Sequence, residues 1–376
     1  MEEFRFLHIW TKPHKKMLAY SYEELLVSAR MQIRVIRHMS DLTKNKWNSR
    51  IICISHIKDV DGCVSAALIK HATNSQFLLA NYGNMNEVLR SIYNTFDIVY
   101  ICDLGINETT VKEFERIRQF AQLTYIDHHP IDASVLKSIQ KMGVKVVHSH
   151  QDCTGVLAHN LLKADLPREA GLLASYAAVS DRLENGFLAK KLLRRYDRDF
   201  ILFETMLLSY ALETADTDYK KKLVPKLSKL EYPHQIPGIM KLAFEQAERE
   251  ATLRRELPLR SQRIGNLCYA DARGDSSGTI ANLLIELCDA EIGVGYVTNE
   301  REQTTDLSIR GAASSRINLG KKASSLTKRF GGTGGGHKKS SGARIPTSKL
   351  MEFMRELSNR RRRNRTPRPG LHSVES

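Results

Sequence analysis

Acidic residues and histidines gather in four short stretches of the first half of the chain. These stretches are SHIKDVDG (55–62), ICDLG (101–105), YIDHHP (125–130) and VSDRLENG (179–186). Carboxylates that converge without cationic partners repel one another, and a bound metal ion is the usual means of neutralising such a group. The stretches therefore predict a metal site, with the following candidate side chains: His56, Asp59, Asp61, Asp103, Asp127, His128, His129 and Asp181.

The donor atoms in these stretches indicate which metal and which chemistry to expect. They are carboxylate oxygens and imidazole nitrogens, with no thiolate evident, and this set favours Mn²⁺ or Mg²⁺. The candidates are numerous enough to hold two metals. Two ions about 3.5–4 Å apart suit attack on a phosphate ester, because they generate hydroxide and stabilise the charged transition state.

Each stretch taken alone has an ordinary structural explanation. DVDG after a strand is typical of a turn, and Asp103 alone could cap a helix or lie on the surface. Asp181 could belong to a helix C-terminal turn that Asn185 and Gly186 then close. The metal hypothesis rests on the combination, because all four stretches follow the end of a predicted element in one domain.

The elements that must position these residues alternate between strands and helices. Predicted strands cover 50–57, 76–82, 97–106, 123–127 and 144–150. Predicted helices lie between and after them, over 62–72, from Asn107 onward, over 132–143, and over TGVLAHNLLKA and REAGLLASYAAVSD. This alternation predicts an α/β fold with a parallel sheet covered on both faces. Ligands of such sheets bind beyond the carboxyl ends of the strands, where the four stretches begin.

The length of 376 residues and the changes of pattern predict two domains and three further segments. Domains run to roughly 100–200 residues each. We expect an N-terminal helical extension (1–48), a parallel-sheet domain (49–200), a charged helical connector (201–258), a smaller α/β domain (259–350) and a basic, disordered tail (351–376).

The six cysteines are scattered, with no CxxC pair, which argues against a disulfide framework. The N-terminus shows no leader pattern, and no run of about 18 apolar residues suggests a membrane span. We therefore expect a cytoplasmic protein without a membrane partner.

Positive charge is concentrated at the C-terminal end. Residues 301–376 contain 18 Lys and Arg against 5 Asp and Glu, a net charge of +13 out of +15 for the whole chain. Such an asymmetry predicts a polyanionic partner, most simply nucleic acid. The alternative, a solvated basic tail, applies mainly to RRRRNR at 360–365.

A glycine-rich stretch, FGGTGGGHKKSSG (330–342), lies within this basic region. Glycine lets the backbone approach an anion closely, so Gly334, Gly335, Gly336 and His337 predict an anion-binding loop. Arg310, near the end of a predicted strand, is a natural partner because its guanidinium suits phosphate. The alternative is a flexible linker.

The motifs, in this order, resemble those of the DHH–DHHA1 phosphoesterase superfamily, with SIRGAASSR (308–316) and GGTGGGHKKSSG (331–342) as the later two. The resemblance covers roughly 50–346 and implies a two-domain phosphoesterase with two metals, usually Mn²⁺, in the cleft between a DHH and a DHHA1 domain.

The resemblance also implies two overlapping ligand sets that share Asp103: His56, Asp59 and Asp103 for one metal, and Asp61, Asp103, His128 and Asp181 for the other. His129, Arg310 and His337 would bind substrate phosphate, and Asp127 would orient the histidines. Two residues, Ile57 and Lys58, separate His56 from Asp59, where the simpler family form has one.

Two branches of the superfamily fit a chain of this size: the RecJ-like exonucleases of archaea and the nanoRNase/pAp phosphatases. Because cationic contacts are most valuable on a polymeric backbone, we expect a RecJ-like exonuclease that degrades single-stranded DNA or RNA from one end. The alternatives are a nanoRNase or pAp phosphatase, a cyclic-dinucleotide phosphodiesterase, and a non-catalytic replication or repair scaffold. The N-terminal helix and the connector could dock a replication or repair protein, or a second copy of the chain.

Overall fold

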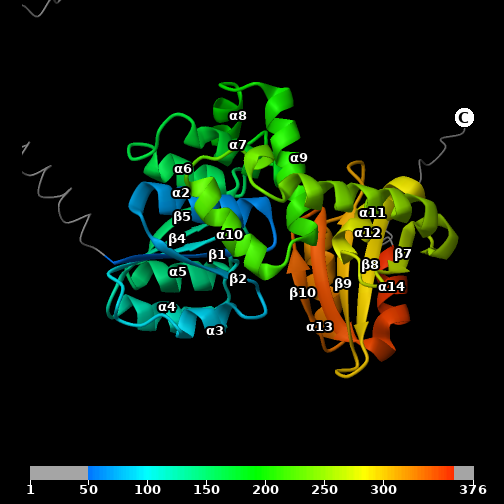
Figure 1. Ribbon diagram of the computed structural model, residues 1–376. Helices are drawn as coiled ribbons and strands as arrows, with labels where there is room; N and C mark the ends of the chain where they lie inside the picture. The colour runs from blue at the N-terminus through cyan, green and yellow to red at the C-terminus, as the bar shows by residue number, and fades with distance from the viewer. Residues whose placement is uncertain (1–49, 360–376) are drawn as a thin grey trace, which may run out of the picture. The chain divides into compact units, whose positions relative to one another are not determined.

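The computed structural model describes residues 50–359. Its first domain is built on a parallel five-stranded sheet with the order β2-β1-β3-β4-β5 (Figure 1). The strands are β1 (Ile51–His56), β2 (Gln76–Ala80), β3 (Ile98–Cys102), β4 (Gln122–Asp127) and β5 (Lys145–His148). All six residues of β1 are buried, as expected of a central strand covered on both faces. The predicted parallel α/β fold is confirmed.

Helices cover both faces of this sheet (Figure 1). One layer consists of α3 (Met85–Arg90), α4 (Glu108–Arg118) and α5 (Ala133–Lys141), which pack on side chains such as Ile52 and Ile54. The other includes α2 (Val60–Thr73), α6 (Thr154–Leu162), α7 (Ala170–Ser180) and α8 (Phe187–Leu193), which pack on Cys53 and Cys102. Because successive side chains of a strand point to opposite faces, neighbouring residues of β1 serve both cores.

The helices that follow complete the first domain instead of only connecting two domains. They are α9 (Arg198–Thr214), α10 (Thr217–Ser228) and the 3-10 turn η1 (Pro233–Gln235). The next helix, α11 (Ile239–Arg260), begins in the core of the first domain with Ile239 and ends in the core of the second with Leu253 and Leu257. Apolar residues of α9 and α10, among them Leu208 and Val224, are fully buried in the same core as α2. The expected boundary at residue 200 falls inside α9, so the connector hypothesis is wrong for α9 and α10.

The second domain contains a six-stranded sheet with the order β10-β11-β9-β8-β7-β6. Its strands are β6 (Gln262–Ile264), β7 (Leu267–Asp271), β8 (Ile292–Asn299), β9 (Thr304–Gly311), β10 (Thr333–Gly336) and β11 (Ser340–Pro346). All neighbouring pairs are antiparallel except β7 and β8. The helices are α12 (Ser277–Leu287), α13 (Leu319–Arg329) and α14 (Leu350–Ser358), with the 3-10 turn η2 (Thr347–Lys349) before the last.

Two expectations for this domain are corrected. The glycine run 333–336 is the edge strand β10, paired with β11, and not a loop. Glycine is required there because a Cβ on Gly334 would approach Thr327 of α13 to 2.8 Å. The predicted disordered tail begins too early, since α14 extends to Ser358 and buries Phe353, Met354 and Leu357 against the sheet.

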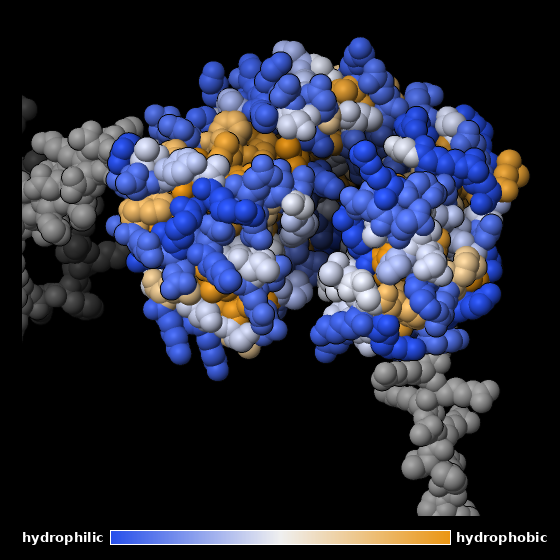
Figure 2. Space-filling model, turned by 90° about the horizontal axis from the view of Figure 1, so that it is seen from below, coloured by the Kyte–Doolittle hydropathy of each residue, from blue (hydrophilic) through white to orange (hydrophobic). Residues whose placement is uncertain are grey.

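The expected N-terminal helix and the arginine-rich end of the tail lie outside the described residues. Within residues 50–359, no helix combines the length and apolarity needed to cross a bilayer. The face seen in Figure 2 is mainly hydrophilic and is hollowed between the two domains.

Candidate metal centre

The first candidate residues lie where β1 ends and α2 begins. His56 is the last residue of β1, and Asp59 is the N-cap of α2, where its side chain accepts a hydrogen bond from the backbone of Gly62 (3.0 Å). The Nδ1 atom of His56 lies 2.8 Å from Asp59 and 3.6 Å from Asp103. A Cβ on Gly62 would approach the His56 carbonyl oxygen to 2.2 Å, so this turn requires glycine. The extra residue between His56 and Asp59 therefore does not keep them apart.

Asp61 and Asp103 lie deeper, with 0% and 1% of their surface exposed. Asp61 accepts hydrogen bonds from the backbone N–H groups of Thr154 (2.8 Å) and Gly155 (2.6 Å) at the start of α6. The Thr154 hydroxyl donates to Asp103 (3.2 Å). Asp103 follows β3 with a left-handed φ of 58°, which aspartate tolerates better than most residues. Two carboxylates that are distant in sequence are thus fixed by the same helix N-terminus.

His128 joins these acids to Asp181. Its Nε2 atom lies 3.2 Å from Asp181, 3.4 Å from Asp103 and 3.8 Å from Asp61. Asp181 is the C-cap residue of α7, and its side chain is 18% exposed. One imidazole nitrogen therefore faces three carboxylates from three different elements.

Asp127 and His129 form a separate pair. The Nδ1 atom of His129 lies 2.8 Å from Asp127, which also accepts a hydrogen bond from the Tyr125 hydroxyl (2.5 Å). These bonds lower the pKa of Asp127 even though burial opposes ionisation. An ionised carboxylate can only accept, so Nδ1 of His129 carries the proton and Nε2 faces the Tyr82 hydroxyl at 2.9 Å.

The two adjacent histidines therefore have different partners. His128 contacts the central acids, whereas His129 contacts Asp127 and Tyr82 most closely, and its Nδ1 atom also lies 3.9 Å from Asp103. Their rings nevertheless lie close, with centroids 4.5 Å apart, because the chain has left strand geometry after Asp127.

Asp61 and Asp181 resist ionisation in the absence of a cation. Burial and the neighbouring Asp103 raise the pKa of Asp61 to about 7. Burial together with Asp61 and Asp103 raises the pKa of Asp181 well above its usual value. Burial also disfavours the charged form of His56, but Asp59 and Asp103 outweigh it and raise the pKa to about 10. The cluster thus favours protons, and by the same physics favours any other cation.

Two buried atoms of the cluster, Nε2 of His56 and Oδ2 of Asp103, have no hydrogen-bond partner among residues 50–359. Buried polar atoms are almost always satisfied, and an unlocated ion is one of the few explanations for an exception. Both are good ligands for a divalent cation, and His56, Asp59 and Asp103 place ligand atoms within 4.8 Å of one another. The residues therefore fit the metal that the sequence predicts.

The second domain contributes His337 to the same place. This residue follows β10, and its ring is stacked against that of His128, with centroids 5.5 Å apart, and lies 5.2 Å from that of His129. Burial and the two neighbouring histidines lower the pKa of His337 to about 4, so it is neutral at pH 7. A neutral imidazole can donate a hydrogen bond without adding charge.

Arg310 and the glycines are placed differently from His337. The Arg310 guanidinium donates to the carbonyl oxygen of the preceding residue, Ile309, and lies against Gly278 at the start of α12. Burial and the nearby Arg182 lower its pKa. Gly334, Gly335 and Gly336 form β10, which leads the chain to His337. Arg310 thus lies near Arg182, which follows Asp181 in sequence, and its hydrogen bond is made within its own strand.

Several residues around the cluster were not expected from the sequence. Cys153 places its sulfur within 4.8 Å of ligand atoms of Asp61 and Asp181. His148 and His150, at the end of β5, contact the carbonyl oxygens of His129 (2.7 Å) and His128 (3.2 Å). The only sequence signal for His148 and His150 was another predicted strand that ends in histidine. The sequence around Tyr82 and Cys153 gave no signal.

Comparisons with known proteins concern the domains and the fold. A family model described as the DHHA1 domain matches residues 263–361. A solved structure titled as the DHH domain of a member of a family of ribosomal proteins has a TM-score of 0.65 at 14% identity, over 82% of this chain and 86% of that one. A search of curated proteins gives no match.

Two further structures share the fold. RecJ of Thermus thermophilus, solved in complex with Mn²⁺, has a TM-score of 0.59 at 14% identity over 86% of this chain, which spans only 54% of that RecJ. The pGpG-specific phosphodiesterase PggH of Vibrio cholerae has a TM-score of 0.50 at 14% identity, over 82% of this chain and 97% of that one. The family model therefore identifies residues 263–361 as a DHHA1 domain, and the structural likenesses show that the chain shares the fold of these solved proteins.

Proposed function

We propose that the protein is a metal-dependent phosphodiesterase, and specifically a RecJ-like exonuclease that hydrolyses single-stranded DNA or RNA from one end. The observation that carries the proposal is the convergence of Asp61, Asp103 and Asp181 on His128, with raised pKa values for two of the three acids. Such a cluster is costly unless a cation neutralises it, and hydrolysis of a phosphate ester is the chemistry that these ligands suit.

The side chains divide into two overlapping ligand sets and a substrate-facing group. His56, Asp59 and Asp103 would hold one divalent ion, and Asp61, Asp103, His128 and Asp181 the other. Such ions would supply activation of water and neutralisation of the negative phosphoryl oxygens. We expect Mn²⁺, with Mg²⁺ as the alternative.

His129 and His337 would act on the substrate itself. His129, with its Nδ1 proton fixed by Asp127, presents Nε2 toward the side that Tyr82 and His337 face. His337, neutral at pH 7, would donate to a phosphate oxygen. Arg310 would contact a neighbouring phosphate and fix the end of the strand.

The preference for a polymer rests on charge. Residues 301–376 carry a net +13, and contacts to many phosphates release many counterions, which a dinucleotide cannot match. Hydrolysis of a short linear dinucleotide is the second candidate, supported by the shared fold of the pGpG-specific phosphodiesterase.

The proposal is tested with a substrate panel in Mn²⁺ and, separately, in Mg²⁺. The panel contains a long single strand, a dinucleotide, pAp and a cyclic dinucleotide. We expect stepwise release of nucleotides from the long strand, and no turnover after removal of divalent ions with a chelator. Faster turnover of any of the small substrates would assign the protein to that branch instead.

Substitution of the proposed metal ligands distinguishes turnover by this protein from turnover by a contaminating nuclease. Asp61→Ala and Asp103→Ala should lower turnover by several orders of magnitude, because each removes a ligand that no neighbour replaces. Asp218→Ala is the control, since Asp218 is 81% exposed and pairs only with Lys221 in the described residues. Thermal unfolding verifies that each variant is folded, and a folded Asp103→Ala variant with most of its activity would contradict the two-metal proposal.

A further inference from the structure

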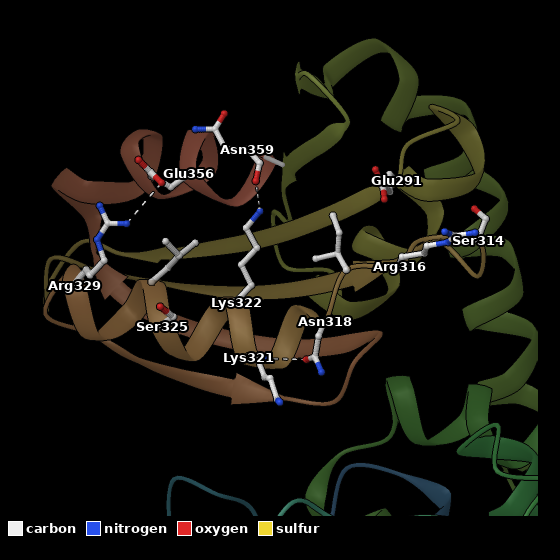
Figure 3. Close-up of a pocket in the computed structure, with 12 residues that line it drawn as sticks. Glu291, Ser314, Arg316, Asn318, Lys321, Lys322, Ser325, Arg329, Glu356 and Asn359 are labelled. Atoms are coloured by element: carbon white, nitrogen blue, oxygen red, sulfur yellow. Dashed lines mark hydrogen bonds and ion pairs between the residues drawn. The ribbon is translucent and has the colours of Figure 1, made fainter. Parts of the chain in front are cut away.

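A cluster of positively charged residues lies on and around α13, in the second domain, whereas the acids of the metal cluster lie in the first. Between Arg310 and Lys349 the chain has ten Lys and Arg and no Asp or Glu. A pocket of about 920 Å³ opens beside α13, lined by the cationic residues Arg316, Lys321, Lys322 and Arg329 (Figure 3). The two acids at its edge are Glu291 and Glu356.

Two of the four cations have structural partners. Lys322 donates to the carbonyl oxygens of Leu357 and Asn359, both at 2.6 Å, and so closes the C-terminus of α14. Arg329 lies 3.6 Å from Glu356, a weak surface pair with both side chains more than a third exposed. These contacts explain why Lys322 and Arg329 stand where they do.

The other two cations have none. The side chains of Arg316 and Lys321 make no hydrogen bond or ion pair with any residue between 50 and 359, and both residues are exposed. The acid nearest to them in the pocket, Glu291, already accepts hydrogen bonds from Asn266 (2.7 Å) and Ser315 (3.0 Å). The pocket therefore presents a net positive charge that the described fold does not use.

Neutral groups of the pocket add to its suitability for phosphate. Ser314 and Ser325 contribute hydroxyl groups, and Asn318 caps the first turn of α13, where the positive end of the helix dipole favours anions. Ile317 and Leu326 give the pocket an apolar part against which a sugar or base could pack. Cations, hydroxyls and an apolar surface together match the phosphate, sugar and base of a nucleotide.

The pocket is joined to the metal cluster through the backbone. The N–H groups of Leu319 and Gly320, in the first turn of α13, donate to the carbonyl oxygens of Lys338 and His337, both at 3.0 Å. The first turn of α13 thus supports His337, and its residues Asn318 and Lys321 also line the pocket. Single-strand sites commonly extend over about 4–16 nucleotides, so one strand could contact both.

We propose that the pocket around Arg316 and Lys321 is a second binding site for the sugar-phosphate backbone of a single-stranded nucleic acid, outside the metal cluster. This inference rests on the proposed function in one respect, because the bound strand would be the substrate whose end lies at the cluster. The site would strengthen binding of long strands and leave the hydrolysis of a dinucleotide unaffected.

The test compares two charge reversals in the full chain. Arg316→Glu/Lys321→Glu alters the pocket, and Lys137→Glu/Lys141→Glu makes the same charge change on exposed residues of α5. Binding of a fluorescent 20-nucleotide single strand is measured by anisotropy at several salt concentrations, and turnover of a dinucleotide is measured with Mn²⁺.

We expect the pocket variant to weaken strand binding about tenfold or more and to reduce the slope of log K against log salt by about 1.4, as for the loss of two phosphate contacts. Dinucleotide turnover should stay at the wild-type rate, and the α5 variant should bind almost normally. Unchanged strand binding, or an equal loss in both variants, would overturn the proposal.

Two further outcomes are informative. If an acidic peptide such as poly-glutamate binds the wild type, fails to bind the pocket variant, and strand binding is unaltered, the surface serves an acidic protein and the inference is wrong. If no substrate of the panel is hydrolysed, the proposed function fails while the anisotropy result still decides whether the site binds nucleic acid.

Discussion

At the scale of single residues, the candidate metal centre buries carboxyl groups close together, an arrangement that is unfavourable without a bound cation. Asp61 and Asp103 are almost completely buried, and Asp103 and Arg182, next to Asp181, both have left-handed backbone angles. Residues held in such conformations cost about 1–3 kcal/mol and concentrate at functional sites. Burial of repelling acids together with backbone strain at the same place is the expected cost of a ligand set.

Replacement of Asp181 by asparagine tests this cost directly. The raised pKa means that the folded metal-free protein binds a proton that the unfolded chain releases, so stability falls as pH rises above the ordinary carboxyl range. Asp181→Asn removes the repulsion and should leave the metal-free protein at pH 8 at least as stable as wild type.

The same variant should lose the stabilisation that Mn²⁺ gives. For wild type we expect Mn²⁺ at about 100 times its Kd to add about 2.7 kcal/mol, and the effect should be larger at pH 8 than at pH 5.5, because the ligands must be ionised. Thermal unfolding with and without the ion measures both effects, and the exposed Asp218→Asn is the control. A full Mn²⁺ shift in Asp181→Asn would show that Asp181 is not a ligand.

The acids and histidines of the centre could be predicted because their signal is local. Each follows the end of a strand or helix within a few residues, so pattern alone locates Asp59, Asp103 and Asp181. Tyr82 and Cys153 reach the centre only through tertiary packing, and the sequence around them has no feature that distinguishes them from core or surface residues. Geometry was needed to find them.

At the scale of elements, the approach of α13 to the glycine strand positions His337. Gly320 lies in the first turn of α13, and a Cβ there would come within 1.9 Å of the Gly336 carbonyl oxygen. The helix can approach β10 this closely only because neither partner has a side chain at the contact. The position of His337 therefore depends on a residue that cannot touch the substrate.

Gly320→Ala should displace His337 and lower kcat/KM by about 100-fold, the order expected for a misplacement of about 1 Å. Mn²⁺-induced stabilisation should be unchanged, because the proposed ligands all lie in the first domain. Gly342→Ala is a matched control, since among the described residues a Cβ at Gly342 would meet only the Leu307 carbonyl oxygen, at an ordinary 3.6 Å, and its φ is not left-handed. Normal kinetics in a folded Gly320→Ala variant would mean that His337 does not contribute to turnover.

The elements show where sequence patterns mislead. The glycines of β10 predicted a loop, because the pattern does not reveal that α13 packs on them. α14 has apolar residues at helical spacing, Leu350, Phe353, Met354 and Leu357, but the arginines that follow made the whole segment resemble a basic tail. The parallel sheet, in contrast, was predicted correctly, because its strands are short buried runs separated by helices.

At the scale of the whole molecule, most of the net positive charge lies in the C-terminal part of the chain. Residues 1–300 contribute a net charge of only +2, whereas 301–376 carry +13. The acids of the metal centre come from the first part, and the cations of the α13 pocket come from the second. Asn359 lines that pocket, and six arginines follow it in sequence between 360 and 368.

Those six arginines should extend binding of a long strand beyond the pocket. Each phosphate contact on a single strand contributes about 0.7 to the slope of log K against log salt, so replacing all six by glutamine should reduce the slope by as much as about 4. Glutamine keeps the length and polarity of the segment, which separates charge from chain length. Anisotropy with the 20-nucleotide strand across a salt series measures the slope, and dinucleotide turnover should stay at the wild-type rate. If the slope is the same as in wild type, these arginines do not contact the strand, and the charge that binds a polyanion lies elsewhere in the chain.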